Sequence, residues 1–484
     1  MGSKKLQVTQ GLLFQVKQLL FTYRMEDNMA KSVSKDMTQG PPMKLIVSFF
    51  LPLMLGMLFQ QFYSMMDTVI VGKFLGVDAL ASVGSTGSIN FMVIGFCMGV
   101  CNGFAIPVAQ RFGAKDYHHL RKFVANSVWL ASGFAVVMTV TVSLLCRKIL
   151  EWMSTPPDII EGAYNYIFVI FLGIPVIYLY NLLSGIIRSL GDSKSPLMFL
   201  ILSSLMNIGL DLALILIFDM GVAGAAWATV ISQGISGVLC LIYMKKKYEV
   251  LKISKDEWRA DRECILKLCN MGIPMGLQYS ITAIGSVILQ ISVNTLGSMA
   301  VASVTASSKV AMFFCCPFDA MGSTMSTYAG QNLGAGKLKR ITEGVLSCCL
   351  IGLAYSVLAF GILYLFGSKI ALLFLDAGET AILGNVRQLL LVNAAAFFTL
   401  ALVNILRFTI QGLGYSKLAV LAGVCEMAAR ALVGAFLVPA AGYIGVCFAS
   451  PVAWIFADIF LIPAYICVMK SLKRKKDGIT VQAA

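Results

Sequence analysis

Two aspartates inside long apolar segments are the residues of this chain whose surroundings most favour chemistry. Asp67 ends a long uncharged run, and Asp211 lies in another apolar segment, one helical turn after Asn207. Positions so spaced share one face of a helix. An ionised carboxylate in such a segment costs at least a few kcal/mol unless it is paired or hydrated. The inner parts of these first segments hold no basic partner, so each aspartate must face water, bind a cation or carry a proton.

Both a proton and Na⁺ fit this pattern of oxygen ligands. If the two carboxylates approach each other, like-charge repulsion and burial favour the binding of a proton. A cluster of hard oxygen atoms suits Na⁺ equally well. The structural alternative is that Asp67 lies at a water interface and Asp211 hydrogen-bonds to a neighbouring helix.

The elements that hold these residues are predicted to be membrane-spanning helices. The 484 residues are 58% hydrophobic and only 13% charged, about half the charged fraction of a soluble protein. This composition excludes an ordinary soluble enzyme, a disordered chain and a nucleic-acid binder, and it makes the lipid bilayer a partner. At about 20 residues per crossing, we predict an all-α membrane protein with twelve transmembrane helices. The predicted spans are 45–70, 87–110, 123–146, 161–183, 195–218, 222–244, 270–296, 306–329, 344–366, 385–406, 418–438 and 444–469.

The boundary between the seventh and eighth predicted spans rests on length alone. The stretch 268–308 carries no charge at all. A single helix of that length would overshoot the bilayer. We therefore place a break between two spans at Gly297-Ser298.

Lysine and arginine are distributed unevenly between the connecting segments. They gather in 111–122, 188–194, 245–267, 337–340, 407–417 and 470–476, whereas the intervening segments hold few. Because cytoplasmic loops collect basic residues, we predict that both termini are cytoplasmic and that the loop Asp376–Glu379 lies outside. The chain is then a multi-pass protein of the plasma or inner membrane. Arg407 is interpreted as part of a cytoplasmic connection, and His118 and His119 as solvated residues of a basic loop.

The chain also contains an internal repeat. Gly76, Ala79, Ala81 and Val83 recur in the second half, with the same spacing, as Gly297, Ala300, Ala302 and Val304, and Gln110-Arg-Phe-Gly113 recurs as Gln331-Asn-Leu-Gly334. Each copy holds six spans, so both enter the membrane from the same side. This predicts two six-helix bundles related by a pseudo-twofold axis along the membrane normal, a transporter architecture. The predicted domains are a polar N-terminal tail over 1–43, an N-lobe over 44–244, a cytoplasmic linker over 245–269, a C-lobe over 270–469 and a basic tail over 470–484.

The second half carries different charged residues. Its positions equivalent to Asp67 and Asp211 hold no acid, which indicates that the first lobe is chemically specialised. Glu426 and Arg430 are four apart and are predicted to form an intrahelical ion pair or to face a cavity. Asp319 and Asp458 have no partner in the local sequence and could attract a cationic substrate. The four residues are therefore candidates for a substrate cavity.

Several motifs resemble the multidrug and toxic compound extrusion (MATE) family. They are Asp67-Thr-x-x-Val-Gly72, Gln110-x-x-Gly113-Ala114, Arg188-x-x-Gly191-Asp-x-Lys194, Gly221-Val-Ala-Gly-Ala-Ala-x-Ala-Thr229 and Gly334-Ala335-Gly. The resemblance covers nearly everything from Met43 to Lys470. It implies a twelve-helix, cation-coupled antiporter that expels cationic and amphipathic compounds.

The resemblance also assigns residues. It implies a cation site, for H⁺ or possible Na⁺, formed in the first lobe by Asp67, Asn207, Asp211 and Thr229, and it places Gln60 and Tyr166 in the cavity of that lobe. The NorM-type branch has acids in the seventh and tenth spans, whereas Gly272–Val287 and Gln388–Leu406 contain none. The chain therefore looks more like the DinF/MepA-like branch, with coupling in the first lobe.

Two alternatives to an efflux antiporter remain. One is a lipid-linked oligosaccharide or lipid flippase of the same superfamily, and the other is a non-transporting membrane scaffold that would tolerate loss of Asp67 and Asp211. The sequence shows no nucleotide-binding loop, metal cluster or nucleophile triad, so we predict no enzyme activity, no cofactor besides the coupling ion, and secondary transport. We expect a monomer that exports small cationic or amphipathic molecules, gives antibiotic resistance and binds no nucleic acid.

Overall fold

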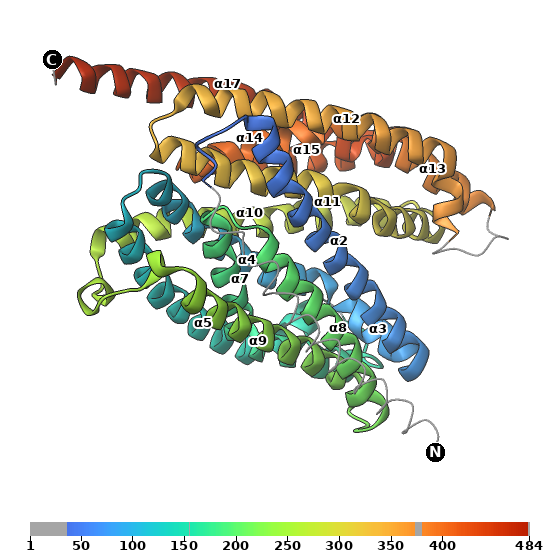
Figure 1. The fold of residues 1–484 in the computed structure, drawn as a ribbon. Helices are drawn as coiled ribbons and strands as arrows, with labels where there is room; N and C mark the ends of the chain where they lie inside the picture. The colour runs from blue at the N-terminus through green and yellow to red at the C-terminus, as the bar shows by residue number, and fades with distance from the viewer. Residues whose placement is uncertain (1–35, 154, 373–379, 483–484) are drawn as a thin grey trace. The chain divides into compact units, whose positions relative to one another are not determined.

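A computed structural model describes residues 36–153, 155–372 and 380–482 of the chain, and these residues form helices with no β-strand (Figure 1). The predicted loop Asp376–Glu379 and residues 1–35 of the predicted N-terminal tail lie outside the described residues. The helices are α2 (Pro42–Leu75), α3 (Val77–Ser85), α4 (Gly87–Gly113), α5 (Tyr117–Trp152), α6 (Ile160–Leu172), α7 (Ile174–Ser189), α8 (Lys194–Leu216), α9 (Gly221–Lys247), η1 (Glu249–Leu251), η2 (Lys255–Trp258), α10 (Arg262–Asn294), α11 (Ser298–Gly334), α12 (Leu338–Ala371), α13 (Thr380–Ala395), α14 (Phe397–Gly412), α15 (Ser416–Leu432), η3 (Val433–Leu437), α16 (Val438–Ala441) and α17 (Tyr443–Gln482).

Twelve membrane crossings are present in this described part of the chain, as predicted. Ten helices are long and apolar enough to span a bilayer, and two bent pairs, α6 with α7 and α13 with α14, add one span each. Large apolar side chains stand on the outside of these helices: Leu144, Val357 and Leu365 are each more than half exposed. Helices that are apolar on their outer faces need lipid around them. The structure therefore confirms an all-α, multi-pass membrane protein.

The internal repeat is visible in the backbone. Gly76 and Gly297 both have φ +89°, and Gly221 and Gly442 have φ +56° and +59°. These left-handed conformations favour glycine, and the two glycines of each pair occupy equivalent positions of the predicted repeat. Gly297 directly precedes α11, so the predicted break at Gly297-Ser298 is confirmed.

The repeat extends to the two bent spans. The first bends by 47° between α6 and α7, and the second by 51° between α13 and α14. The breaks fall at Gly173 and Ala396. Pro175 stands in the first turn of α7, where it removes a backbone donor and favours a new helix start. No proline accompanies Ala396, so the second bend has no such local signal.

The described chain divides into two compact units. The first comprises Asp36, 55–108 and 116–269, and the second comprises 37–54, 109–115 and the chain from residue 270. The first turns of α2 and the end of α4 therefore group with the second unit, although the expected N-lobe ran without interruption over 44–244. The boundary at residues 269 and 270 coincides with the expected start of the C-lobe.

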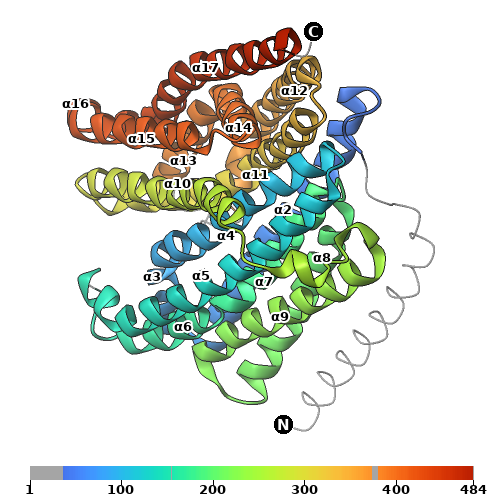
Figure 2. The ribbon, with the colours of Figure 1, turned by 90° about the vertical axis from the view of Figure 1, so that its left-hand side faces the viewer.

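Each unit has its own helix packing. In the first, α9 packs against α6, α7 and α8, and α5 packs against α6 and α7 (Figure 2). In the second, α11 packs against α12, α13 and α14, and α17 packs against α13, α14 and α15 (Figure 1). These contacts bring side chains from distant parts of the sequence together inside each unit.

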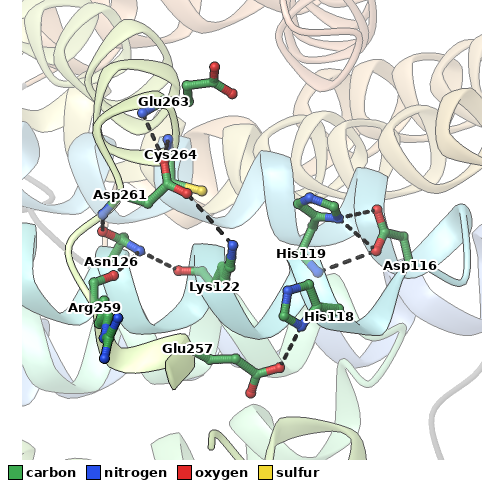
Figure 3. Close-up of polar contacts among 10 residues, drawn as sticks. All are labelled: Asp116, His118, His119, Lys122, Asn126, Glu257, Arg259, Asp261, Glu263 and Cys264. Carbon is green, nitrogen blue, oxygen red and sulfur yellow. Dashed lines mark hydrogen bonds and ion pairs between the residues drawn. The ribbon is translucent and has the colours of Figure 1, made fainter. Parts of the chain in front are cut away.

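The segment predicted to be a polar linker, 245–269, is docked onto the start of α5 (Figure 3). Glu257 of η2 accepts hydrogen bonds from Nε of Arg121 at 2.8 and 2.9 Å, and its Oε1 lies 3.0 Å from Nδ1 of His118. Farther along α5, Oδ1 of Asn126 accepts from the backbone N–H of Asp261 at 2.9 Å. The hydrogen bond from Arg121 lowers the pKa of Glu257 to about 2, against the opposing effect of burial.

The two histidines are solvent-exposed, as predicted, but they stand in the first turn of α5 rather than in a loop. Their side chains are about half exposed, but both have partners: His118 contacts Glu257, and Nδ1 of His119 lies 2.8 Å from Oδ2 of Asp116 (Figure 3). Asp116 precedes α5 and accepts from the backbone N–H of His119, which caps the helix. The histidines therefore help to define the start of α5 and its contact with the linker.

Candidate functional site

Four helices of the first unit bring together the predicted cation-site residues and Tyr166, a predicted cavity residue. Asp67 lies on α2, Tyr166 on α6, Asn207 and Asp211 on α8, and Thr229 on α9. Asp211 is fully buried, whereas Asn207 is 1% and Asp67 7% exposed. The packing of α9 against both α6 and α8 explains how residues from separate segments meet.

Two contacts define the geometry of this site. Nδ2 of Asn207 donates a hydrogen bond to Oγ1 of Thr229 at 3.2 Å. The carboxyl groups of Asp67 and Asp211 lie within hydrogen-bonding reach of each other. Two ionised carboxylates can only accept hydrogen bonds, and they repel each other. The contact is therefore favourable only when a proton or a cation lies between them.

The site has more buried acceptor oxygens than donors. Oδ1 of Asp67, both carboxylate oxygens of Asp211 and Oδ1 of Asn207 have no hydrogen-bond partner in the described part of the chain. Buried polar atoms are normally paired, and each unpaired one costs about 1–3 kcal/mol. A bound proton or small cation would satisfy several of these atoms together.

The set of oxygens suits a monovalent cation better than a transition metal. No group of three or more His, Cys, Asp or Glu that could hold a metal ion occurs among the described residues. The possible ligands are instead two carboxylates, the amide oxygen of Asn207 and the hydroxyl of Thr229. Hard oxygen ligands of this kind favour Na⁺ or a proton over soft metal ions.

Two further residues of the site were missed by the sequence reasoning. Tyr63 on α2 lies near Asp67 and Asp211, and its hydroxyl meets the side chain of Gln233 on α9. Helix spacing could have indicated both residues, because Tyr63 stands four residues before Asp67, and Gln233 stands four residues after Thr229. Each therefore lies on the same helix face as a residue already assigned.

The two predicted cavity residues of this unit differ in position. Tyr166 is 7% exposed and lies near Tyr63, Asp67 and Asp211. Gln60 is half-buried and stands about two turns before Asp67 on α2. Tyr166 thus belongs to the group around the carboxylates, and Gln60 extends the same helix face.

A second polar group lies inside the second unit. Glu426 on α15 is contacted by Arg407 on α14 and, at 3.8 Å, by Nη2 of Arg430 one turn further along α15. Asp458 on α17 is 6% exposed, and the charges of Arg407 and Glu426 both act on it. Asp319 on α11 is exposed, and the charge of Arg407 also reaches it.

Arg407 requires a correction. It was interpreted as a residue of a cytoplasmic connection, but it is 5% exposed within α14 and pairs with Glu426. The predicted pair of Glu426 and Arg430 is present, yet Arg407 is the nearer partner. Local spacing suggested only Arg430, because Arg407 is distant in the sequence and stands on another helix.

Comparison with known proteins identifies the family. The family model described as MatE matches residues 52–213 and 274–437, which is more than half of the chain. The chain belongs to the MATE family. The two matched segments fall in the two halves of the internal repeat, and Asp67, Tyr166, Asn207 and Asp211 lie in the first of them.

Relatives and solved structures agree with this assignment. The chain is 29% identical to the probable multidrug resistance protein YoeA of Bacillus subtilis over 76% of this chain and 80% of the relative, and 30% identical to YpnP of the same organism over 72% and 78%. It is 23% identical to the multidrug export protein MepA of Staphylococcus aureus over 80% and 86%. A crystal structure of MATE in complex with MaL6 has the same fold, with a TM-score of 0.85 at 22% identity over 92% of this chain and all of that one.

Three residues of the polar groups lie beyond the segments that the MATE model matches. Thr229 and Gln233 follow the first matched segment, and Asp458 follows the second. Thr229 is tied to the cation-site residues by its hydrogen bond with Asn207. Asp458 is tied to the second group through Arg407 and Glu426. The structure is therefore needed to place these residues, and the family to which the chain belongs consists of transporters, not enzymes.

Proposed function

We propose that this MATE transporter is a secondary active multidrug exporter, which expels cationic and amphipathic small molecules in exchange for H⁺ or Na⁺. Its relatives named multidrug resistance or multidrug export proteins support this substrate class. We place it in the plasma or inner membrane with both termini in the cytoplasm, on the uneven distribution of lysine and arginine. The protein works as a monomer surrounded by lipid.

The observation that carries this proposal is the buried contact between Asp67 and Asp211. Together with Asn207 and Thr229, these residues offer oxygen atoms that lack donors. When the coupling ion binds there, the charge of the carboxylates is neutralised. A cationic substrate then binds less strongly, because the negative charge that attracts it has been neutralised. The ion can shift the equilibrium between transport states only because its affinity differs between those states.

A flippase for pyrophosphate-linked lipids is less well supported. Such a protein needs basic groups that are available to an anionic head group. Three arginines within the described helices are already engaged: Arg188 donates to Ser184 and Asn102, and Arg407 and Arg430 both contact Glu426. A scaffold without transport activity would have no use for a buried pair of carboxylates.

Transport by reconstituted vesicles tests the proposal. Purified protein is placed in lipid vesicles, and movement of ethidium is followed with a proton gradient or a Na⁺ gradient imposed separately. We expect one gradient to drive ethidium movement well above the rate of empty vesicles. Movement that follows neither gradient would contradict the antiport proposal.

Asp211→Asn is the matched variant for this experiment. It removes the charge while keeping the side-chain shape, so we expect ethidium movement to fall to the level of empty vesicles. Asp219→Asn is the control, because Asp219 is an exposed residue after the end of α8 in the same unit. Normal transport by Asp211→Asn would remove this residue from the coupling site.

A further inference from the structure

The second unit contains a group of four charged side chains that the proposed coupling site does not use. Arg407 comes from α14, Glu426 and Arg430 from α15, and Asp458 from α17. Each of these side chains is at most about a tenth exposed. The helices that carry them pack against one another: α15 and α17 are in contact, and α14 contacts both. The group is therefore interior to the unit.

The two carboxylates of this group differ in the partners that surround them. Glu426 has a partner on each oxygen, with Arg407 at Oε1 and Arg430 at Oε2. Asp458 has none: both of its oxygens lack a hydrogen-bond partner in the described part of the chain. An uncompensated buried carboxylate costs several kcal/mol, and it costs more in a membrane protein, where water is scarce. Asp458 is therefore unfavourable as an anion in this arrangement.

The two arginines retain donors that could serve Asp458. Nε of Arg407 and Nη1 of Arg430 have no hydrogen-bond partner among the described residues. The charge of Arg407 already acts on Asp458, as does that of Glu426. An arginine presents five N–H donors in a fixed fork, so Arg407 has the donors to bind Asp458 in place of Glu426.

The helices around Asp458 contain irregular turns. α17 contains Pro451 before Asp458 and Pro463 after it, and each proline removes one helix hydrogen bond. The π-helical turn η3 begins directly after α15 and packs against α17. Turns of this type are rare and occur frequently at functional sites. Irregular backbone therefore flanks Asp458 on α17 and follows Glu426 and Arg430 on α15.

We propose that Asp458 is a second proton-binding site, in which Glu426 and Asp458 are alternative partners of Arg407. With a proton on Asp458, Arg407 stays with Glu426. When that proton leaves, Asp458 is an anion and competes for Arg407. The other charged or titratable groups that face Asp458 or Arg407 are Arg430 on α15, Cys349 on α12 and Asp319 on α11.

This proposal goes beyond the export function and does not depend on it. It gives each unit its own buried carboxylate, although the second unit lacks acids at the positions equivalent to Asp67 and Asp211. The two sites differ in kind. In the first site, two carboxylates lie next to each other, whereas in the second site, two carboxylates compete for one arginine.

Infrared spectroscopy of the full chain in detergent tests the proposal directly, because a protonated carboxyl group absorbs separately from a carboxylate. The background is the double variant Asp67→Asn, Asp211→Asn, which removes the signal of the first site. At neutral pH we expect this background to retain a protonated-carboxyl band. Asp458→Asn, added to it, should remove that band, and an unchanged band would overturn the proposal.

Two further variants test the exchange of partners and provide a control for the band. In the same background, Glu426→Gln frees Arg407 for Asp458, so the band should weaken although Asp458 is present. A band of full strength would overturn the exchange of partners. Asp219→Asn, at an exposed position, should leave the band unchanged. Asn has the shape of a protonated aspartate, so Asp458→Asn should elute from size-exclusion chromatography like the background, and a misfolded variant would itself contradict a neutral Asp458.

Discussion

Gly113 and Gln331 meet backbone to backbone at the ends of α4 and α11 in the second unit. A Cβ atom on Gly113 would lie 1.9 Å from the carbonyl oxygen of Gln331. The equivalent pair of the repeat makes the reciprocal contact, because a Cβ on Gly334 would lie 1.8 Å from the carbonyl oxygen of Gln110. Such distances leave no room for any side chain, and no flexible group can move aside. The glycines of the repeated motif are therefore required by close packing of two helix ends.

Gly113→Ala should destabilise the protein. The added methyl group must push two backbones apart, and overpacking of this kind costs about 1–3 kcal/mol. We expect a lower midpoint of thermal unfolding in detergent, and Gly334→Ala should lower it similarly. Gly133→Ala is the control, since a Cβ there meets nothing within 4 Å, and alanine favours a helix interior. Equal midpoints for Gly113→Ala and Gly133→Ala would refute the contact.

Binding of a permanent cation should strengthen as pH rises. Deprotonation restores negative charge at Asp67 and Asp211, and one additional charge near the ligand is worth about 1.4 kcal/mol, or about tenfold in affinity. Calorimetric titration with ethidium between roughly pH 5.5 and 8.5 would measure the effect. The double variant Asp67→Asn, Asp211→Asn should bind with the same affinity throughout. A pH slope that survives in this variant would point to Asp458 or Glu426 instead.

Glu257→Gln should loosen the linker. At pH 7 the charged hydrogen bond with Arg121 is intact, and losing such a bond costs about 1.5–3 kcal/mol. Trypsin should therefore cleave after Lys255 and Arg259 several times faster in this variant. Glu249→Gln is the control, because the pair of Glu249 with Lys252 is exposed. Equal cleavage rates for the two variants would show that Glu257 does not hold the linker.

The same contact predicts a pH dependence. The pKa of Glu257 is about 2 in the folded protein and 4.5 when unperturbed. A lowered pKa stabilises the folded form above the unperturbed value, and this stabilisation is lost as pH falls from about 4.5 toward 2. Hydrogen exchange of the linker, corrected for the intrinsic rate at each pH, should increase over that interval. Glu257→Gln should show no such increase.

The orientation in the membrane can be tested by labelling introduced cysteines. The uneven basic charge predicts that Asp376→Cys is labelled from outside and Lys255→Cys from the cytoplasm. Both changes belong in a background without the thirteen native cysteines, of which Cys467 is exposed. Labelling of both positions from one side would contradict the proposed orientation.

The sequence was sufficient for the spans because hydrophobicity is a local property. Long uncharged runs located all twelve crossings, and their length required the break at Gly297. The bend at Ala396 could not be foreseen in this way. Its repeat partner Gly173 is followed closely by Pro175, whereas Ala396 stands in an apolar run without proline.

The sequence also does not show which side chains of different helices lie next to each other. Asp67 and Asp211 could be selected as acids in apolar segments, but their approach depends on how α2 and α8 pack. The partner of Glu426 illustrates the same limit: spacing pointed to Arg430, and the fold added Arg407. The charge of Arg407 suggested a connecting segment, and its burial depends on an ion pair that no local pattern reveals.

The reciprocal contact of Gly113 with Gln331 and of Gly334 with Gln110 has a local twofold symmetry. A surface in which residue i meets residue j, while j meets i, is the kind that two identical chains form around a twofold axis. These helix ends therefore pair within one chain as two copies of a subunit would pair. Each copy of the repeat supplies a glycine and the carbonyl oxygen that faces the glycine of the other copy. The packing of the helix ends is thus common to both copies, whereas the pair Asp67 and Asp211 belongs to the first copy alone.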